Sequence, residues 1–181
     1  GGGSNDDDDD DDDEDSSPDV SPTPKPGENK ISSEFNEDDI QSALDNAKDG
    51  VVNLEVKDAK DADEVKAVIN GNVLSSLKEK AIERIQVDTG IATVSINTGL
   101  LMSGEGAAPS SVELLVRKVD VSGLSEEVRS MVGDNTVYDF DLSVDGKKVS
   151  SFKKNDIVIS FDYTLRPGEK PGKVVVYYIN D

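Results

Sequence analysis

Residues 136–181 read TVYDFDLSVDGKKVSSFKKNDIVISFDYTLRPGEKPGKVVVYYIND, and this stretch decides the fold. Apolar and polar side chains alternate over residues 138–144, which is the period-two pattern of a half-buried strand. The pair Asp145-Gly146 follows at once and favours a type I′ hairpin turn, because both central residues of that turn need a positive φ. A second alternating run at 157–163 predicts another strand. The stretch is therefore a set of strands joined by turns.

The chain closes on a third apolar run. Two proline–glycine pairs, at 167-168 and 171-172, mark the connection that leads to it. Residues 174–179, VVVYYI, are continuously apolar, as is typical of a strand buried on both faces.

Upstream, apolar spacing predicts two helices. The first covers residues 36–48, with Asn36 as its N-cap, an acidic first turn, Lys48 in the last turn and Gly50 after it. The second begins at Asn72 and places Val73, Leu74, Leu77 and Ala81 on one face.

Further short elements complete the pattern. Alternation predicts strands at 52–56, 65–69, 85–87, 92–96 and 112–116. Residues 103–111 form a glycine- and serine-rich loop, and Ser125 caps one or two helical turns that end at Gly133. No internal repeat is evident. The predicted fold class is α+β and β-rich: an antiparallel β-sandwich-like module with two short helices, behind a disordered acidic tail.

Four passages of the chain also resemble a known family. They are AIERIQVDTGIATVSINTGLL, LSEEVRSMVGDNTVYDF, VYDFDLSVDGKKVSSF and YTLRPGEKPGKVVVYYIND, and the resemblance extends over roughly residues 36–181. In this order they resemble a module of large cell-surface proteins of Gram-positive bacteria, often of the S-layer or S-layer-homology type and in some cases surface glycosidases. Asn97 stands where such modules usually carry proline.

The resemblance implies a location and a role. It implies a non-catalytic, extracellular structural or spacer module at the cell surface or in the cell wall. Its partners would be the other domains of the same surface protein, and cell-wall polysaccharide is a further candidate. Two alternatives stay open: a glycan- or cell-wall-binding module, and an accessory domain of a surface glycosidase. We also expect a signal peptide upstream and a further strand pair beyond Asp181.

Charge divides the chain at residue 30. The 181 residues carry 39 acidic and 19 basic side chains, a net charge of −20. Residues 1–30 include ten consecutive acids, followed by prolines spaced among serines and threonine. Such a segment repels itself and has almost nothing to bury, so we predict a disordered acidic Pro/Ser linker at 1–30 and a β-rich module at 31–181. So acidic a chain is not expected to bind nucleic acid.

The sequence lacks the residue types on which most enzymes depend. The chain has no histidine and no cysteine, and it contains no nucleotide-binding or nucleophile motif. Asp139 and Asp141 share a strand face and are candidates for the carboxylate pair of a glycoside hydrolase, but the interpretation we favour is that both line the solvent side of that strand. We therefore predict that the protein is not an enzyme, has no catalytic residue and needs no cofactor.

Two further motifs are candidate binding sites. Asp141, Ser143, Asp145 and Gly146 resemble the start of a calcium loop, but Phe152 occupies the position of the bidentate glutamate, so no metal site is predicted. Tyr177 and Tyr178 point to opposite faces of a strand, so at most one is available to stack on a sugar. An isopeptide cross-link between lysine and asparagine would suit a surface protein, but it requires three groups that meet in the core. The binding residues stay unassigned.

Overall fold

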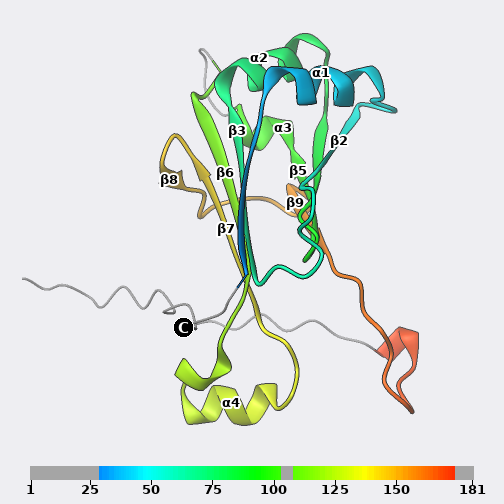
Figure 1. The fold of residues 1–181 in the computed structure, drawn as a ribbon, viewed down its shortest axis with the longest axis vertical. Coiled ribbons are helices and arrows are strands. Elements are labelled where there is room, and N and C mark those ends of the chain that lie inside the picture. Colours follow the sequence, from blue (N-terminus) through cyan, green and yellow to red (C-terminus); the bar gives the residue numbers. More distant parts are fainter. Residues whose placement is uncertain (1–28, 103–107, 174–181) are drawn as a thin grey trace, which may run out of the picture.

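The computed structural model describes residues 29–102 and 108–173, which form two sheets packed face to face with helices at both ends (Figure 1). Sheet A has the order β1-β3-β6-β7-β8, and its strands are Lys30–Phe35, Glu64–Asn70, Ser111–Lys118, Tyr138–Val144 and Lys147–Lys148. Sheet B has the order β2-β4-β5-β9, with strands Val51–Glu55, Arg84–Asp88, Thr93–Asn97 and Ile157–Ser160. The helices are α1 (Glu37–Asp45), α2 (Gly71–Glu79), α3 (Thr98–Leu101) and α4 (Glu126–Val132), with 3₁₀ turns η1 (Val121–Gly123) and η2 (Pro171–Lys173). The predicted β-rich α+β class is confirmed.

The first half of the fold consists of two successive β–α–β units. The units β1–α1–β2 and β3–α2–β4 each cross from sheet A to sheet B, and they lie side by side. In sheet A, Lys30 lies opposite Glu64, a displacement of 34 residues, and in sheet B Val51 lies opposite Arg84, a displacement of 33. The structure thus contains an internal repeat that the sequence analysis did not find. Because both pairings are parallel, each sheet is mixed rather than wholly antiparallel.

The third unit, β5–α3–β6, runs in the opposite direction, from sheet B to sheet A. Strand β5 pairs antiparallel with β4, and β6 pairs antiparallel with β3. In all three units an asparagine stands immediately before the helix, namely Asn36, Asn70 and Asn97. Each side chain accepts a hydrogen bond from a backbone N–H of the first helical turn, at 2.9, 3.4 and 2.9 Å respectively. These N-caps stop each strand and start each helix at the same end of the sandwich.

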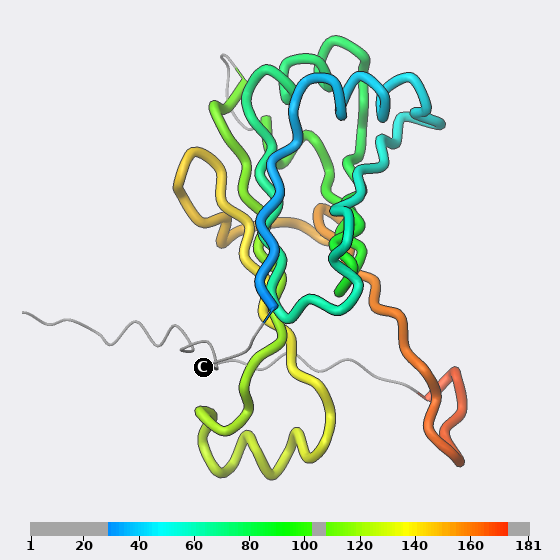
Figure 2. The backbone as a smooth tube through the Cα atoms, in the orientation of Figure 1, coloured from blue at the N-terminus to red at the C-terminus, as the bar shows by residue number. Residues whose placement is uncertain are grey.

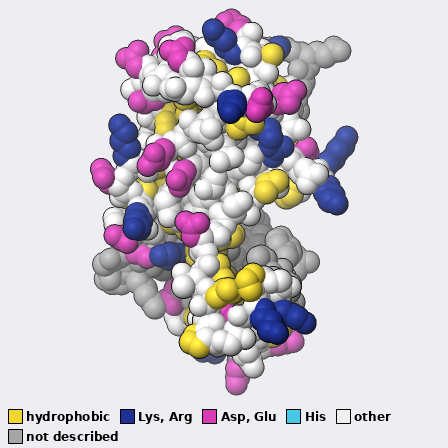
Figure 3. Space-filling view, turned by 90° about the vertical axis from the view of Figure 1, so that its right-hand side faces the viewer, with side chains coloured by type: hydrophobic (Ala, Val, Ile, Leu, Met, Phe, Trp, Pro, Cys, Tyr) yellow, Lys and Arg dark blue, Asp and Glu magenta, His cyan; other side chains and the backbone are white. Residues whose placement is uncertain are grey.

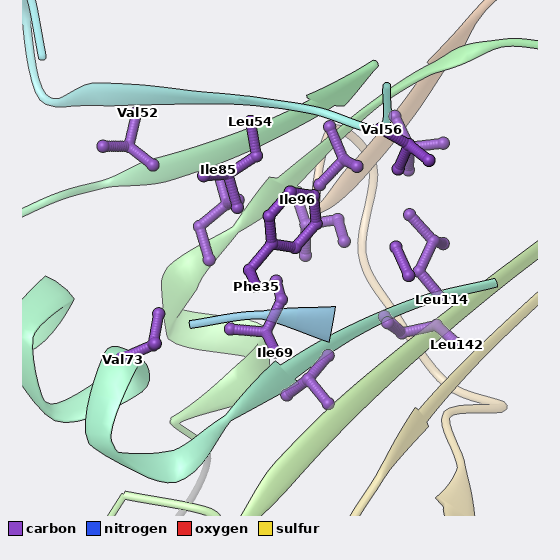
Figure 4. Close-up of a cluster of buried hydrophobic side chains, with 14 of the residues drawn as sticks. Phe35, Val52, Leu54, Val56, Ile69, Val73, Ile85, Ile96, Leu114 and Leu142 are labelled. Atoms are coloured by element: carbon purple, nitrogen blue, oxygen red, sulfur yellow. The ribbon is translucent and has the colours of Figure 1, made fainter. Parts of the chain in front are cut away.

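The core lies between the sheets and is almost wholly apolar. Figure 4 shows side chains from both sheets meeting there, with the ring of Phe35 among them. Within the described residues only two polar side chains are buried, Thr89 and Thr98. Each has a partner: the Thr89 hydroxyl donates to the carbonyl of Ala92 at 2.6 Å, and that of Thr98 to the carbonyl of Ile82 at 2.6 Å. The core therefore contributes stability by burial, without a buried charge to compensate.

The two chain ends of the sandwich lie at the same pole. Helices α1, α2 and α3 follow the ends of β1, β3 and β5, so these three strands begin at the opposite pole, near α4 (Figure 1). Lys30 is the first residue of β1, and Ser160 pairs with Thr93, the first residue of β5. The chain therefore enters and leaves the sandwich at the α4 pole. Beyond Ser160 it continues into an arm, residues 161–173, that projects from this pole (Figure 2).

The helix predictions need three corrections. Helix α1 ends at Asp45 and not at residue 48, because the chain turns at Asn46 and Lys48 instead pairs with Val51 across a turn. Helix α2 begins at Gly71, since Asn70 and not Asn72 is its cap. Ala81 lies beyond its end and is exposed. The short helix α3 was not predicted, whereas α4 has the predicted Ser125 cap and Gly133 end.

The strand predictions are largely confirmed, with exceptions at the ends. Strand β1 was not predicted, and it begins at Lys30, one residue before the expected domain boundary. Strand β9 ends at Ser160, so Phe161 and Tyr163 of the predicted strand lie outside it. Ser111 belongs to β6, while residues 103–107 of the predicted loop, the predicted strand 174–179 and residues 1–28 of the tail lie outside the described residues. No helix in the described part is long and apolar enough to cross a membrane.

Candidate functional site

Asp139 and Asp141 lie on the outer face of sheet A, side by side along β7, as predicted. Arg117 of β6 lies directly opposite Asp139, and its Nε donates to Asp139 Oδ2 at 2.8 Å. The same guanidinium is 3.9 Å from Asp141, whose other carboxylate oxygen is 2.8 Å from Nζ of Lys148. Each carboxylate therefore faces a cation rather than an open substrate position.

This cluster belongs to a larger ladder of opposite charges. Arg117 also lies 3.9 Å from Glu64, which pairs with Lys30 at 3.4 Å, while Lys66 pairs with Glu113 at 3.3 Å. The pairs connect neighbouring strands from β1 across to β8. The hydrogen bond from Lys148 to Asp141, and then the charge of that carboxylate, raise the pKa of Lys148. Opposite charges that face each other across neighbouring strands in this way stabilise the sheet.

The predicted hairpin turn is present, and it uses the side chain of Asp145. Asp145 has φ +50° and Gly146 φ +78°, the two positive values of a type I′ turn. Oδ1 of Asp145 accepts hydrogen bonds from the backbone N–H groups of Ser110 and Ser111, at 2.6 and 3.0 Å. This carboxylate is thus engaged in fastening the hairpin to the start of β6. The calcium-loop pattern is explained by the turn, and the described ranges hold no group of three or more acidic side chains placed to bind a metal.

Tyr177 and Tyr178 lie outside the described residues, but other aromatic side chains meet at the α4 pole. The rings of Tyr138, at the start of β7, and Phe161, just after β9, lie 4.4 Å apart between centroids. This contact links the two sheets on their β7–β9 side. Tyr138 is 37% exposed and Tyr163 of the arm 48% exposed. Sequence reasoning placed Tyr138 at the start of one strand and Tyr163 at the end of another. Tyr138 is the first residue of β7, whereas Tyr163 lies beyond the end of β9.

The arm is held by a cluster that the sequence analysis missed. One oxygen of Glu169 accepts hydrogen bonds from the hydroxyl of Tyr163 at 2.7 Å and from the backbone N–H of Arg166 at 2.8 Å. The Arg166 guanidinium in turn donates to Asp134, after α4, at 3.0 Å. The backbone bond from Arg166 and then the tyrosine bond lower the pKa of Glu169, and the bond to Glu169 raises the pKa of Tyr163. We call this cluster the arm clamp.

An isopeptide cross-link needs a lysine, an asparagine and an acid together in the core. Within the described residues no side chain of these three types is buried, since Thr89 and Thr98 are the only buried polar residues. The core therefore supplies no setting for that chemistry. No family model, curated protein or solved structure matches this chain.

Proposed function

We propose that this chain is a non-catalytic, extracellular structural module of a bacterial cell-surface or S-layer-type protein. The observation that carries the proposal is the state of its ionisable side chains. Those that lie close together across strands, around Arg117 and Asp139, are joined in ion pairs on the outer face of sheet A. The core between the sheets holds no ionisable side chain among the described residues. Such an arrangement stabilises a scaffold, and it engages the carboxylates of Asp139 and Asp141 with Arg117 and Lys148.

The surrounding sequence supports the same proposal. The resemblance over residues 36–181 is to modules of Gram-positive surface proteins, and the acidic segment at 1–30 has the composition of a spacer. The partners proposed are the other domains of the same surface protein. The net charge of −20 opposes binding to nucleic acid and favours solubility in a crowded cell wall.

Two measurements on the full chain test this function. Incubation with purified peptidoglycan and cell-wall polysaccharide should release no sugar or peptide, and Asp139→Asn and Asp141→Asn should behave as the parent does. Antibodies against the purified chain should label intact cells that produce it, and brief protease treatment should remove that label. Turnover abolished by either carboxylate substitution would contradict the non-catalytic role, and labelling only after cell lysis would contradict the location.

A glycan- or wall-binding module is the second candidate, because aromatic rings are exposed at the α4 pole. Tyr138 and Tyr163 offer ring surface for stacking on a sugar, with the polar groups of the arm clamp nearby. Co-sedimentation of the full chain with purified cell wall separates this candidate from the first. Retention that Tyr163→Ala abolishes and Phe152→Ala preserves would favour binding at the pole; Phe152 is likewise exposed but is not in the clamp.

A further inference from the structure

Among the edge strands of the described part, β9 is the one that carries no charged side chain. The two sheets end at β1, β8, β2 and β9. The first three contain charged side chains, namely Lys30, Glu34, Lys147, Lys148 and Glu55, whereas β9 reads IVIS. Charges on an edge strand discourage pairing with another chain, and an apolar edge without them is a template for a further strand. The outer edge of β9 is therefore the edge best suited to a partner.

The backbone groups on this edge can be assigned by position. The N–H of Asn97 in β5 donates to the carbonyl of Asp156 at 2.8 Å, so the even-numbered residues from Asp156 onward direct their N–H and C=O groups toward β5. Because this direction alternates along a strand, the odd-numbered residues direct theirs outward. The backbone of residues 161–165 makes no hydrogen bond to another described residue. The outward groups of β9 therefore continue into the arm.

Apolar side chains occupy every second position of the same stretch, namely Ile157, Ile159, Phe161, Tyr163 and Leu165. The first three pack against the core, but Tyr163 is 48% exposed and Leu165 39%, because the arm extends beyond the start of β5 at Thr93. On the side of the molecule seen in Figure 3, hydrophobic side chains reach the surface in the lower part, the end from which the arm projects. Exposed apolar side chains that gather in this way mark an interaction site.

Two copies of this stretch are complementary when they pair antiparallel about Phe161. In that register Tyr163 lies opposite the partner's Ile159, and Leu165 lies opposite the partner's Ile157. Opposite residues of an antiparallel pair share a face, so the exposed apolar side chains of each arm meet the apolar face of the other copy's β9. The outward backbone groups also meet, since all of these positions are odd-numbered.

Charge selects this register over its neighbours. It places Arg166 opposite the partner's Asp156, at both ends of the pairing by symmetry. A shift of two residues in one direction places Arg166 opposite the partner's Lys154, and a shift in the other direction places Asp162 opposite the partner's Asp162. In the single chain the Arg166 guanidinium pairs with Asp134, whose side chain is 86% exposed. Such an exposed pair contributes little, so the guanidinium is able to change partner.

We propose that two copies of the chain associate about a two-fold axis at Phe161, with residues 162–166 of each arm paired antiparallel to residues 156–160 of the other copy. The outer edge of β9 is then covered over its whole length, and sheet B becomes continuous across both copies. The arm clamp supports the pairing, because it holds the arm through the Tyr163 hydroxyl and does not use the backbone of residues 161–165. At physiological salt the repulsion between two chains of net charge −20 is screened beyond about 8 Å, which permits the contact.

Analytical ultracentrifugation of the full chain at physiological salt tests the association. The parent should reach the mass of two copies by about 100 μM. Asp156→Arg or Arg166→Asp alone places like charges at both ends of the pairing, and each should raise the dissociation constant about tenfold or more. Glu79→Arg, exposed at the end of α2, changes the net charge by the same amount as Asp156→Arg and should leave the constant within about threefold of the parent value.

A mixture of the two reversed variants provides the sharpest comparison. In a mixed pair each arginine again faces an aspartate, so Asp156→Arg and Arg166→Asp should bind each other about as tightly as the parent binds itself. Amide protection in β6 reports that each variant is folded. A parent that stays monomeric at about 100 μM, reversed variants that associate as the parent does, or a mixture that fails to recover the association would overturn the proposal.

Disulfide trapping measures the register independently, since the parent chain has no cysteine. Val158→Cys combined with Thr164→Cys places two thiols opposite each other across the two copies, at positions whose Cα atoms lie about 4.5 Å apart. Within one extended chain these positions are roughly 20 Å apart, too far for a disulfide. Oxidation should therefore give a covalent dimer of the double variant and not of either single variant. A dimer that forms without this cross-link would have a different interface and would refute the pairing about Phe161.

Discussion

A Cβ atom on Gly90 would lie 2.5 Å from both the carbonyl carbon and the carbonyl oxygen of Ala59. The turn after β4 therefore packs backbone against backbone on the connection between β2 and β3. Gly90 also has φ +78°, a conformation that side chains disfavour. Both facts require glycine at position 90, where the units β1–α1–β2 and β3–α2–β4 meet at the α4 pole.

Gly90→Ala should lower the free energy of unfolding by roughly 2 kcal/mol or more, because it adds backbone strain and a clash with Ala59. Urea denaturation followed by circular dichroism measures it. Gly123→Ala is the control, since a Cβ there meets nothing within 4 Å, and it should change the value by less than about 0.5 kcal/mol. Equal midpoints for the two variants would contradict the close approach.

Removing any one of the asparagine caps should cost about 1 kcal/mol of unfolding free energy, because a backbone N–H of the first turn loses its acceptor. The variants are Asn36→Ala, Asn70→Ala and Asn97→Ala. Asn53→Ala, on the exposed side of β2, is the comparison and should change the value by less than about 0.5 kcal/mol. If all three cap variants matched Asn53→Ala in thermal melts, the caps would not be what starts the helices.

Deleting residues 1–28 should leave the melting temperature within about two degrees of the parent value. The cut spares Asn29, whose backbone N–H donates to Asp63 at 3.0 Å and whose carbonyl accepts from Asp63 N at 2.8 Å. At physiological salt the screening length is about 8 Å, so the acidic segment has little influence on the sandwich. Millimolar calcium should not change the melt of either form.

A longer cut supplies the contrast. Deleting residues 1–35 also removes β1, and with it the buried ring of Phe35 and the parallel pairing with β3, so the melting temperature should fall steeply. A large loss already on deleting 1–28, or calcium stabilisation that needs those residues, would show that the acidic segment binds the module.

The arm clamp should respond to pH through Glu169. Its pKa lies below the ordinary 4.5 because its ionised form accepts the Arg166 and Tyr163 hydrogen bonds. A folded pKa below the unfolded one means that this stabilisation is present above pH 4.5 and is lost as the pH falls through the folded pKa. At the other extreme, the pKa of Tyr163 is raised, so its bond is lost as the pH rises through that value.

Nuclear magnetic resonance follows this directly. The chemical shifts of the Arg166 amide and the Tyr163 ring should change together as the pH is lowered from 5, while those of the β6 amides stay constant. Glu169→Gln should remove the shared transition. Independent titration of the two signals, or a transition that survives in Glu169→Gln, would refute the clamp.

The local pattern of apolar and polar residues was enough to predict most of the strands and helices, and it predicted the hairpin turn most clearly. Alternation located β2 to β7, and Asp145-Gly146 has the two positive φ values expected of it. Strand β1 escaped because its inward positions include Ser33, which interrupts the apolar alternation between Ile31 and Phe35. The strand is buried because it pairs with β3, which lies 34 residues further along the chain, and the sequence of residues 30–35 alone does not reveal that pairing.

Pairing and site geometry were harder to predict for the same reason. Strand β9 follows the β7–β8 hairpin in sequence, yet it crosses to sheet B and pairs with β5. The expected face of Asp139 and Asp141 is confirmed, but their shared partner Arg117 lies 22 positions upstream of Asp139. Such partners follow from the sheet order, which alternation does not encode.

The position of Lys30 and Ser160 at one pole has a mechanical consequence. A chain pulled at these two points does not load the strands of the sandwich along their length. The load falls first on the backbone hydrogen bonds between β1 and β3 at Lys30, and the following pairs then separate one after another. In a longer protein under tension, the strands of the module would therefore not lie along the direction of the force. The module would unfold at low force by separation of β1 from β3, rather than at high force by the sliding of whole strands past one another.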